Sequence, residues 1–259
     1  MGQIEVVPVS GGVGVEVHNV DIKNGIDAET FGELRAAFVE HGLIFLRDQD
    51  ITPDEHIAFA ERWGQININR FFPRLDGYDQ IATVTKEPDQ TTNIGGGWHT
   101  DHSYDHVPAM GSILIARETP PVGGDTLFAC MYTAYDTLSD GLKQTLEDMK
   151  AVHSSRHIFG EQSSYRDTMK DRFSNPEDAT QDAVHPVVIT HPESGRKALY
   201  VNPGFTLHFD GWTAAESKPL LDYLYAHAVQ LEHTTRFQWA PGSIAFWDNR
   251  CTWHYALND

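Results

Sequence analysis

The sequence GGGWHTDHSYD, residues 95–105, places two histidines and two aspartates within seven consecutive positions. His99 and Asp101 lie two positions apart, and in an extended strand such residues point to the same side. Both side chains can therefore reach one metal ion, while Thr100 faces away. Two histidines and one carboxylate on one face of an ion, with the opposite face open, suit Fe(II) and oxygen chemistry. The spacing thus predicts a metal site that needs a third ligand from elsewhere in the chain.

His254 is the predicted third ligand. The stretch PGSIAFWDNRCTWH, residues 241–254, contains a turn, a strand-like run, a polar reversal and then His254 at the start of a further extended segment. A strand that faces the first pair would bring this imidazole to the same ion. The second His-x-Asp sequence, from His208 to Asp210, is better interpreted as a strand end before a helix. Surface or capping positions are expected for other histidines, namely His18, His41, His56, His153, His185, His191, His227 and His233.

The elements that must position these ligands are mostly short strands. Segments rich in β-branched or aromatic residues and bounded by turn formers predict strands at 43–46, 80–84, 111–116, 126–129, 184–190, 198–201 and 243–247. Helices are predicted at 27–40, after capping boxes that begin at Thr52 and Thr213, and over 141–149. The helices do not alternate with the strands, which favours a sandwich or barrel over a parallel α/β sheet.

The composition disfavours several functions. The chain has 259 residues, enough for one domain, and its formal net charge of −18 disfavours a nucleic-acid partner but allows a small anionic substrate. We find no apolar run of membrane-spanning length and no secretory signal. The chain has only two cysteines, so it has no disulfide framework. A cytoplasmic protein without a membrane partner is therefore expected. No dinucleotide loop, Walker motif or Gly-x-Ser-x-Gly elbow is present.

Four motifs occur in a recognisable order: W-H-T-D at 98–101, P-x-x-G-G-D-T at 120–126, V-N-P-G-F-T at 201–206 and W-D-N-R-x-T-x-H at 247–254. Together they resemble the TauD/TfdA family of Fe(II)- and 2-oxoglutarate-dependent dioxygenases, over the chain from about Leu43 onward. The resemblance implies a mainly β fold with flanking helices, the double-stranded β-helix, also called a jelly roll or cupin-like fold. It implies a single domain of this kind over residues 1–259.

The resemblance also implies roles for particular residues. His99, Asp101 and His254 would bind Fe(II), and Thr126 would bind the far carboxylate of the co-substrate 2-oxoglutarate. The residues at positions that line the substrate pocket are Asn69, Phe72, His102 and Phe205. Taurine-hydroxylating relatives carry His and Tyr at the first two of these positions, so taurine itself is not expected. Cations that could bind another anion, or simply lie on the surface, are Arg70, Arg74, Arg156 and His157.

One part of the family pattern is missing from the printed chain. The family binds 2-oxoglutarate through an arginine on its last strand, a short way after the distal histidine. This sequence ends at Asp259, and Arg250 belongs to the turn before His254. We therefore expect a C-terminal strand beyond residue 259.

The implied activity is hydroxylation of a small, anionic organic substrate by O2 with 2-oxoglutarate, with cleavage of a carbon–heteroatom bond for some substrates. Candidate substrates are sulfonates, sulfate esters, aryloxyalkanoates and similar acids, and similar enzymes are commonly homo-oligomers, either dimers or tetramers. Two alternatives stay open at this point. The same three ligands could hold Zn(II) in a hydrolase, or the jelly roll could be a non-catalytic, cupin-like binding module.

Overall fold

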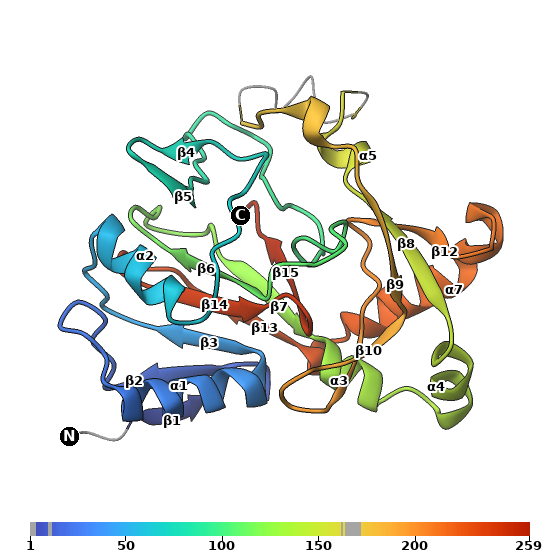
Figure 1. Cartoon of the computed structure of the whole chain (residues 1–259), viewed down its shortest axis with the longest axis horizontal. Coiled ribbons are helices and arrows are strands. Elements are labelled where there is room, and N and C mark those ends of the chain that lie inside the picture. The colour runs from blue at the N-terminus through green and yellow to red at the C-terminus, as the bar shows by residue number, and fades with distance from the viewer. Residues whose placement is uncertain (1–3, 10–11, 162, 164–171) are drawn as a thin grey trace.

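A five-stranded sheet forms one layer of the molecule (Figure 1). The structure is a computed structural model, and it describes residues 4–9, 12–161, 163 and 172–259. In spatial order the strands of this main sheet are β1 (Glu5–Pro8), β2 (Val15–His18), β3 (Leu43–Leu46), β14 (Ile244–Asp248) and β6 (Gly111–Ile115). Helices α1 (Ala28–His41) and α2 (Pro53–Glu61) pack their apolar side chains on one face of it.

A second sheet packs on the opposite side of β3 and β14. Its antiparallel strands lie in the order β13 (Thr234–Phe237), β7 (Thr126–Cys130) and β15 (Thr252–Ala256). Phe45 of β3 stacks on Phe237 of β13 with ring centroids 4.0 Å apart, and it meets the ring of Phe128 of β7 edge-on at 5.6 Å. Two sheets that face each other in this way form the sandwich that the sequence predicts.

The remaining elements surround this sandwich (Figure 1). A smaller antiparallel sheet contains β12 (Thr206–Phe209), β8 (Lys150–Ser154) and β9 (Asp182–Pro186), and helix α7 (Ala214–Ala228) packs beside β12. Two hairpins pair β4 (Arg74–Leu75) with β5 (Tyr78–Ala82) and β10 (Val188–Thr190) with β11 (Lys197–Leu199). The other helical segments are α3 (Met131–Asp136), α4 (Asp140–Leu146), α5 (Arg156–Phe159), η2 (Pro176–Asp178) and η3 (Leu231–His233). Within the described ranges, no helix has the length and apolar character needed to cross a membrane.

The helix starts predicted from the sequence are confirmed by their caps. The Asp27 side chain caps α1, and Thr52 and Thr213 each form a capping box at the start of α2 and α7. The single strand predicted over 184–190 is wrong, because it consists of two strands, β9 and β10. β9 ends at Pro186, whose nitrogen has no hydrogen to donate to a neighbouring strand.

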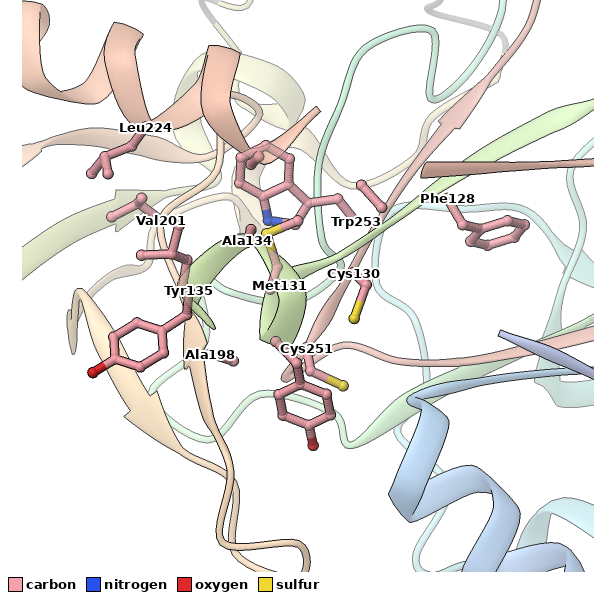
Figure 2. Close-up of a cluster of buried hydrophobic side chains, with 14 of the residues drawn as sticks. Phe128, Cys130, Met131, Ala134, Tyr135, Ala198, Val201, Leu224, Cys251 and Trp253 are labelled. Carbon is pink, nitrogen blue, oxygen red and sulfur yellow. The ribbon is translucent and has the colours of Figure 1, made fainter. Parts of the chain in front are cut away.

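Strand β14 is fixed between two apolar cores. On one side, Phe246 stacks on Phe38 of α1 with ring centroids 4.0 Å apart. On the other side lies a larger core, in which Trp253 of β15 packs with side chains of α3 and α7, among them Met131 and Leu224 (Figure 2). All five residues of β14 are buried. This buried strand leads through a short turn into β15, which carries His254.

Candidate metal centre

His99 and His254 lie directly opposite each other in an antiparallel bridge. The amide of His99 donates to the carbonyl oxygen of His254 at 3.2 Å, and the amide of His254 donates to the carbonyl oxygen of His99 at 2.8 Å. Opposite residues carry their side chains on the same face of the pair, and the two imidazole centroids lie 4.1 Å apart. The extended segment that faces the first pair is therefore the one that carries His254, as predicted.

Asp101 completes a cluster of three side chains. Its Oδ1 lies 3.7 Å from Nε2 of His99 and 3.8 Å from Nε2 of His254. One donor atom from each of the three residues lies within 4.8 Å of the other two. Two donors bonded to one ion at about 2.0–2.2 Å lie at most about 4.4 Å apart. Both distances from Asp101 therefore allow a shared ion.

The protonation states of these side chains also suit a metal. Nδ1 of His99 lies 2.7 Å from the carbonyl oxygen of Gly97 and donates to it, and Nε2 is the ring nitrogen that faces Asp101. Burial, followed by the proximity of His99, lowers the pKa of His254 to about 3, so this imidazole is neutral near pH 7. Burial raises the pKa of Asp101, but the nearby histidines and a hydrogen bond from Ser112 outweigh burial and hold the pKa below its ordinary value. Two imidazoles and one carboxylate are a ligand set that fits Fe(II).

The cluster opens into a cavity of about 460 Å³. Thr126, the first residue of β7, lines this cavity, and its hydroxyl accepts a hydrogen bond from Nε1 of Trp239 at 2.9 Å. A hydroxyl has one proton and two lone pairs, so Thr126 still has its proton to donate to an acceptor in the cavity. A donor at this position suits a bound carboxylate.

The residues predicted to line a substrate pocket fall into two groups. Three of them line the cavity, namely Asn69, Phe72 and His102. Phe205 is not among the lining residues. It is 4% exposed and lies in an apolar cluster with Tyr104, where the two ring centroids are 4.8 Å apart, and its ring lies 6.1 Å from that of His99. Phe205 therefore packs behind the residues that line the cavity near His99, because its side chain lies in this apolar cluster.

The cations considered for substrate binding have other partners. Arg70 pairs with Asp105, Arg74 with Asp79 and Arg156 with Asp182, and His157 contacts the carbonyl oxygen of Gly204. Among the residues that the structure describes, no lysine or arginine lines the cavity. Within the described part of the chain, an anion bound in this cavity would therefore meet hydrogen-bond donors and histidines, but no permanent positive charge.

Comparison with known proteins identifies the family. The sequence profile described as "Taurine catabolism dioxygenase TauD, TfdA family" matches residues 5–258. The chain belongs to the TauD/TfdA family. One TauD/TfdA relative, the alpha-ketoglutarate-dependent sulfate ester dioxygenase of Pseudomonas putida, is 33% identical over 260 residues, which cover 99% of this chain and 85% of that protein.

Two further comparisons cover nearly the whole of this TauD/TfdA chain. An (S)-phenoxypropionate/alpha-ketoglutarate-dioxygenase of Sphingobium herbicidovorans is 32% identical over 259 residues, which cover 97% of this chain and 88% of that protein. The crystal structure of a taurine dioxygenase from Burkholderia xenovorans matches with a TM-score of 0.81 and 34% sequence identity, and the match covers 98% of this chain and 83% of that chain.

These similarities confirm the jelly-roll fold and the enzyme class predicted for this TauD/TfdA chain. The protein is an Fe(II)- and 2-oxoglutarate-dependent dioxygenase, an oxidoreductase that uses O2 and a small-molecule substrate. The family membership favours this activity over a zinc hydrolase and over a non-catalytic binding module. The cluster of two histidines and one aspartate in the cavity agrees with the cofactor that the family uses.

Sequence patterns do not identify three other residues of this TauD/TfdA site. Ser112 donates to Asp101, Trp239 donates to Thr126, and Gly204 packs against His99. A Cβ atom at Gly204 would lie 2.6 Å from Cβ of His99, and the V-N-P-G-F-T motif is the signal that could have indicated this close approach. Ser112 and Trp239 each contact a residue that is distant in the sequence, so no local pattern points to them.

Several of the histidines expected at surface or capping positions are buried. His153 is 0% exposed and His191 is 1% exposed, and His191 lies 3.0 Å from a carboxylate oxygen of Asp248. His233 is also buried, but it does have a capping role, because its Nδ1 lies 2.9 Å from the carbonyl oxygen of His227 in the last turn of α7. Their burial depends on partners from other elements and is not visible in the local sequence.

Proposed function

We propose that this protein hydroxylates a small organic acid, and that His99, Asp101 and His254 bind the Fe(II). The observation that supports this assignment is the convergence of their donor atoms, within 4.8 Å of one another, at the wall of a large cavity. Fe(II) with 2-oxoglutarate supplies the oxidising chemistry when bound, in which the co-substrate loses CO2 to give succinate. The protein's own residues bind and orient the two organic molecules beside the three ligands.

Thr126 is the proposed donor to the far carboxylate of 2-oxoglutarate. Its proton is available because Trp239 already donates to its oxygen. A carboxylate that loses contact with water also needs a charged partner, and no lysine or arginine lines the cavity in the described ranges. We therefore propose that this charged partner lies outside the residues that the structure describes.

The proposed substrates are sulfate esters, aryloxyalkanoates and sulfonates. The first two classes are proposed because the names of two relatives specify a sulfate ester and a phenoxypropionate. Oδ1 of Asn69 accepts hydrogen bonds from the amides of Phe71 and Phe72 at 2.9 and 3.0 Å, so its NH2 group is the part available to an acid group. The Phe72 ring offers an apolar surface to the rest of the substrate. Nδ1 of His102 lies 3.0 Å from Asp105, so Nε2 is the nitrogen left for a ligand in the cavity.

Two measurements test this function. Addition of Fe(II) and 2-oxoglutarate to the apoprotein without O2 should give the weak visible charge-transfer band of a metal–oxoacid chelate, and His254→Ala should abolish it. Under air, succinate release should then depend on one member of a panel of sulfate esters, sulfonates and aryloxyalkanoates, with taurine as the negative comparison. A protein that gives no band, or that gives the same band without His254, would contradict the assignment of the ligands.

We propose the cytoplasm as the compartment, and two buried free cysteines, Cys130 and Cys251, support a reducing environment. The absence of a nucleic-acid partner is proposed from the net charge of −18. Assembly into a dimer or tetramer stays a prediction. Light scattering coupled to size-exclusion chromatography measures the mass of the particle directly, and a monomeric mass would contradict it.

A further inference from the structure

The turn between β14 and β15 contains Asn249, a residue of the W-D-N-R motif to which the proposed function assigns no role. Asn249 is 1% exposed, and its carbonyl oxygen accepts a hydrogen bond from Oγ1 of Thr100 at 2.7 Å. Thr100 is the residue between His99 and Asp101, and it faces away from the cavity as its position in the sequence predicts. The turn that precedes the distal ligand is therefore bonded directly to the segment that carries the other two.

The two carboxylate oxygens of Asp101 have different surroundings. Oδ1 faces the two histidines, whereas Oδ2 accepts a hydrogen bond from Oγ of Ser112 at 2.7 Å. An ionised carboxylate only accepts hydrogen bonds, so the Ser112 proton points at Asp101. The Ser112 oxygen in turn lies 3.4 Å from Nδ2 of Asn249, which also donates to the carbonyl oxygen of Ala109 at 3.2 Å. A chain of hydrogen bonds thus runs from the turn through Ser112 to the carboxylate.

This chain of hydrogen bonds limits how Asp101 can bind a metal. A carboxylate can bind a metal through one oxygen or through both. Because Ser112 occupies Oδ2, only Oδ1 faces the two histidines. The proposed reaction needs half of the coordination sphere free for an oxoacid and O2, so a second bond from the same carboxylate would occupy a position that the reaction uses.

We propose that Ser112, held by Asn249, is a positioning residue that restricts Asp101 to a single metal bond through Oδ1. The proposal rests on the assignment of Asp101 as a metal ligand. Hydrogen-bond partners of metal ligands typically change metal affinity by about 10- to 100-fold when they are removed. Loss of the Ser112 hydroxyl should therefore weaken metal binding by a factor in this range and change the coordination of the ion that does bind.

The test uses Co(II) bound to the full chain, so that no substrate is needed. Calorimetric titration gives the affinity, and the visible spectrum of Co(II) reports the number and type of its ligands. Ser112→Ala removes the donor, Ser112→Cys provides a weaker one, and Ser112→Thr keeps a hydroxyl at the same position. Thr145→Ala is the matched control, because it deletes a hydroxyl that bonds to the carbonyl oxygen of Gly141 in α4, away from the site.

The expected order of Co(II) affinity is wild type, then Ser112→Thr, then Ser112→Cys, then Ser112→Ala, with a changed spectrum in the last two and no change in the control. Asn249→Ala should change the spectrum in the same direction by a smaller amount. If Ser112→Ala binds Co(II) within about twofold of wild type with an unchanged spectrum, the positioning role is wrong. A His254→Ala variant that binds Co(II) as tightly as wild type would instead refute the ligand assignment itself, so the two failures are distinguishable.

Discussion

Replacement of Asp248 by alanine should strongly destabilise the fold. Asp248 is the last residue of β14 and is 0% exposed. One of its oxygens lies 3.0 Å from Nε2 of His191 and 2.6 Å from a guanidinium nitrogen of Arg250, and the other accepts from the same guanidinium at 2.8 Å. Burial raises the pKa of Asp248, but these two partners outweigh burial and keep the pKa below its ordinary value. The group is therefore a buried carboxylate with two partners.

The expected loss follows from what the substitution leaves behind. Removal of one member of a buried ion pair typically costs about 3–5 kcal/mol, because the remaining charged or polar groups stay buried without a partner. His191 is 1% exposed and the Arg250 side chain is 17% exposed, so neither can regain much water. A loss of this size is a large part of the roughly 5–15 kcal/mol that stabilises a typical domain. Asp248→Asn keeps one acceptor and should cost less.

Equilibrium unfolding in urea, followed by circular dichroism, measures the change in the free energy of unfolding. The control is Asp222→Ala, which deletes an exposed pair with Lys218, whose side chain is 73% exposed, and should change stability by less than about 1 kcal/mol. If Asp248→Ala costs no more than this control, the reasoning about the buried pair is refuted.

Three further predictions concern other parts of the molecule. Burial and the nearby His185 lower the pKa of His153 from 6.5 to about 3, so the unfolded chain takes up a proton below about pH 6.5 that the folded chain does not. Stability is then lost as the pH falls from 6.5 towards 3, by up to about 1.4 kcal/mol per pH unit. Urea unfolding at several pH values should show that the free energy of unfolding depends less on pH in His153→Gln than in wild type. The same dependence on pH in both proteins would contradict this prediction. Gly204→Ala should weaken Mn(II) binding, because the new Cβ would lie 2.6 Å from Cβ of His99. Gly141→Ala is the control, because its new Cβ would have no atom within 4 Å and should leave Mn(II) binding unchanged. Calorimetric titration measures both affinities, and equal affinities for the two variants would contradict the prediction. Thr126→Val should raise the KM for 2-oxoglutarate by roughly tenfold or more, as expected for loss of a hydrogen bond to a charged group, and an unchanged KM in a succinate assay would exclude that bond.

The sequence indicates the three proposed ligands more clearly than it indicates the side chains around them. His99 and Asp101 can be paired from their spacing alone, because a strand repeats every two residues. The spacing does not supply the third ligand. His254 is predicted because an extended segment begins there, but the bridge that sets it opposite His99 joins distant segments and is not visible in the local sequence. The burial of His153 likewise depends on its packing against β9, β12 and their neighbours, which local sequence does not encode. Phe205 is predicted to line the substrate pocket, but it lies in an aromatic cluster and is not among the residues that line the cavity.

For the secondary structure too, elements marked by local signals can be predicted from the sequence, and elements that depend on distant partners cannot. Helices α1, α2 and α7 begin at side chains that satisfy the free amides of the first turn, and such caps are visible in the sequence. Helix α3 has no side-chain cap and four of its residues are buried, so neither a start signal nor an amphipathic pattern marks it. Strand β8 is also absent from the predicted set, because its stability comes from β12 and β9, which flank it.

The bridge between His99 and His254 joins segments from the middle and from near the end of the chain. Contacts of such long range are costly to form, because the loop-closure entropy is lost before they contribute any stability. If the ligands bind iron as proposed, the metal binds the folded chain and not the unfolded one. It then stabilises the folded chain by about 2.7 kcal/mol when free iron is at 100 times the dissociation constant. Iron supply would then govern how long each copy of the protein survives proteolysis, in addition to how fast it turns over its substrate.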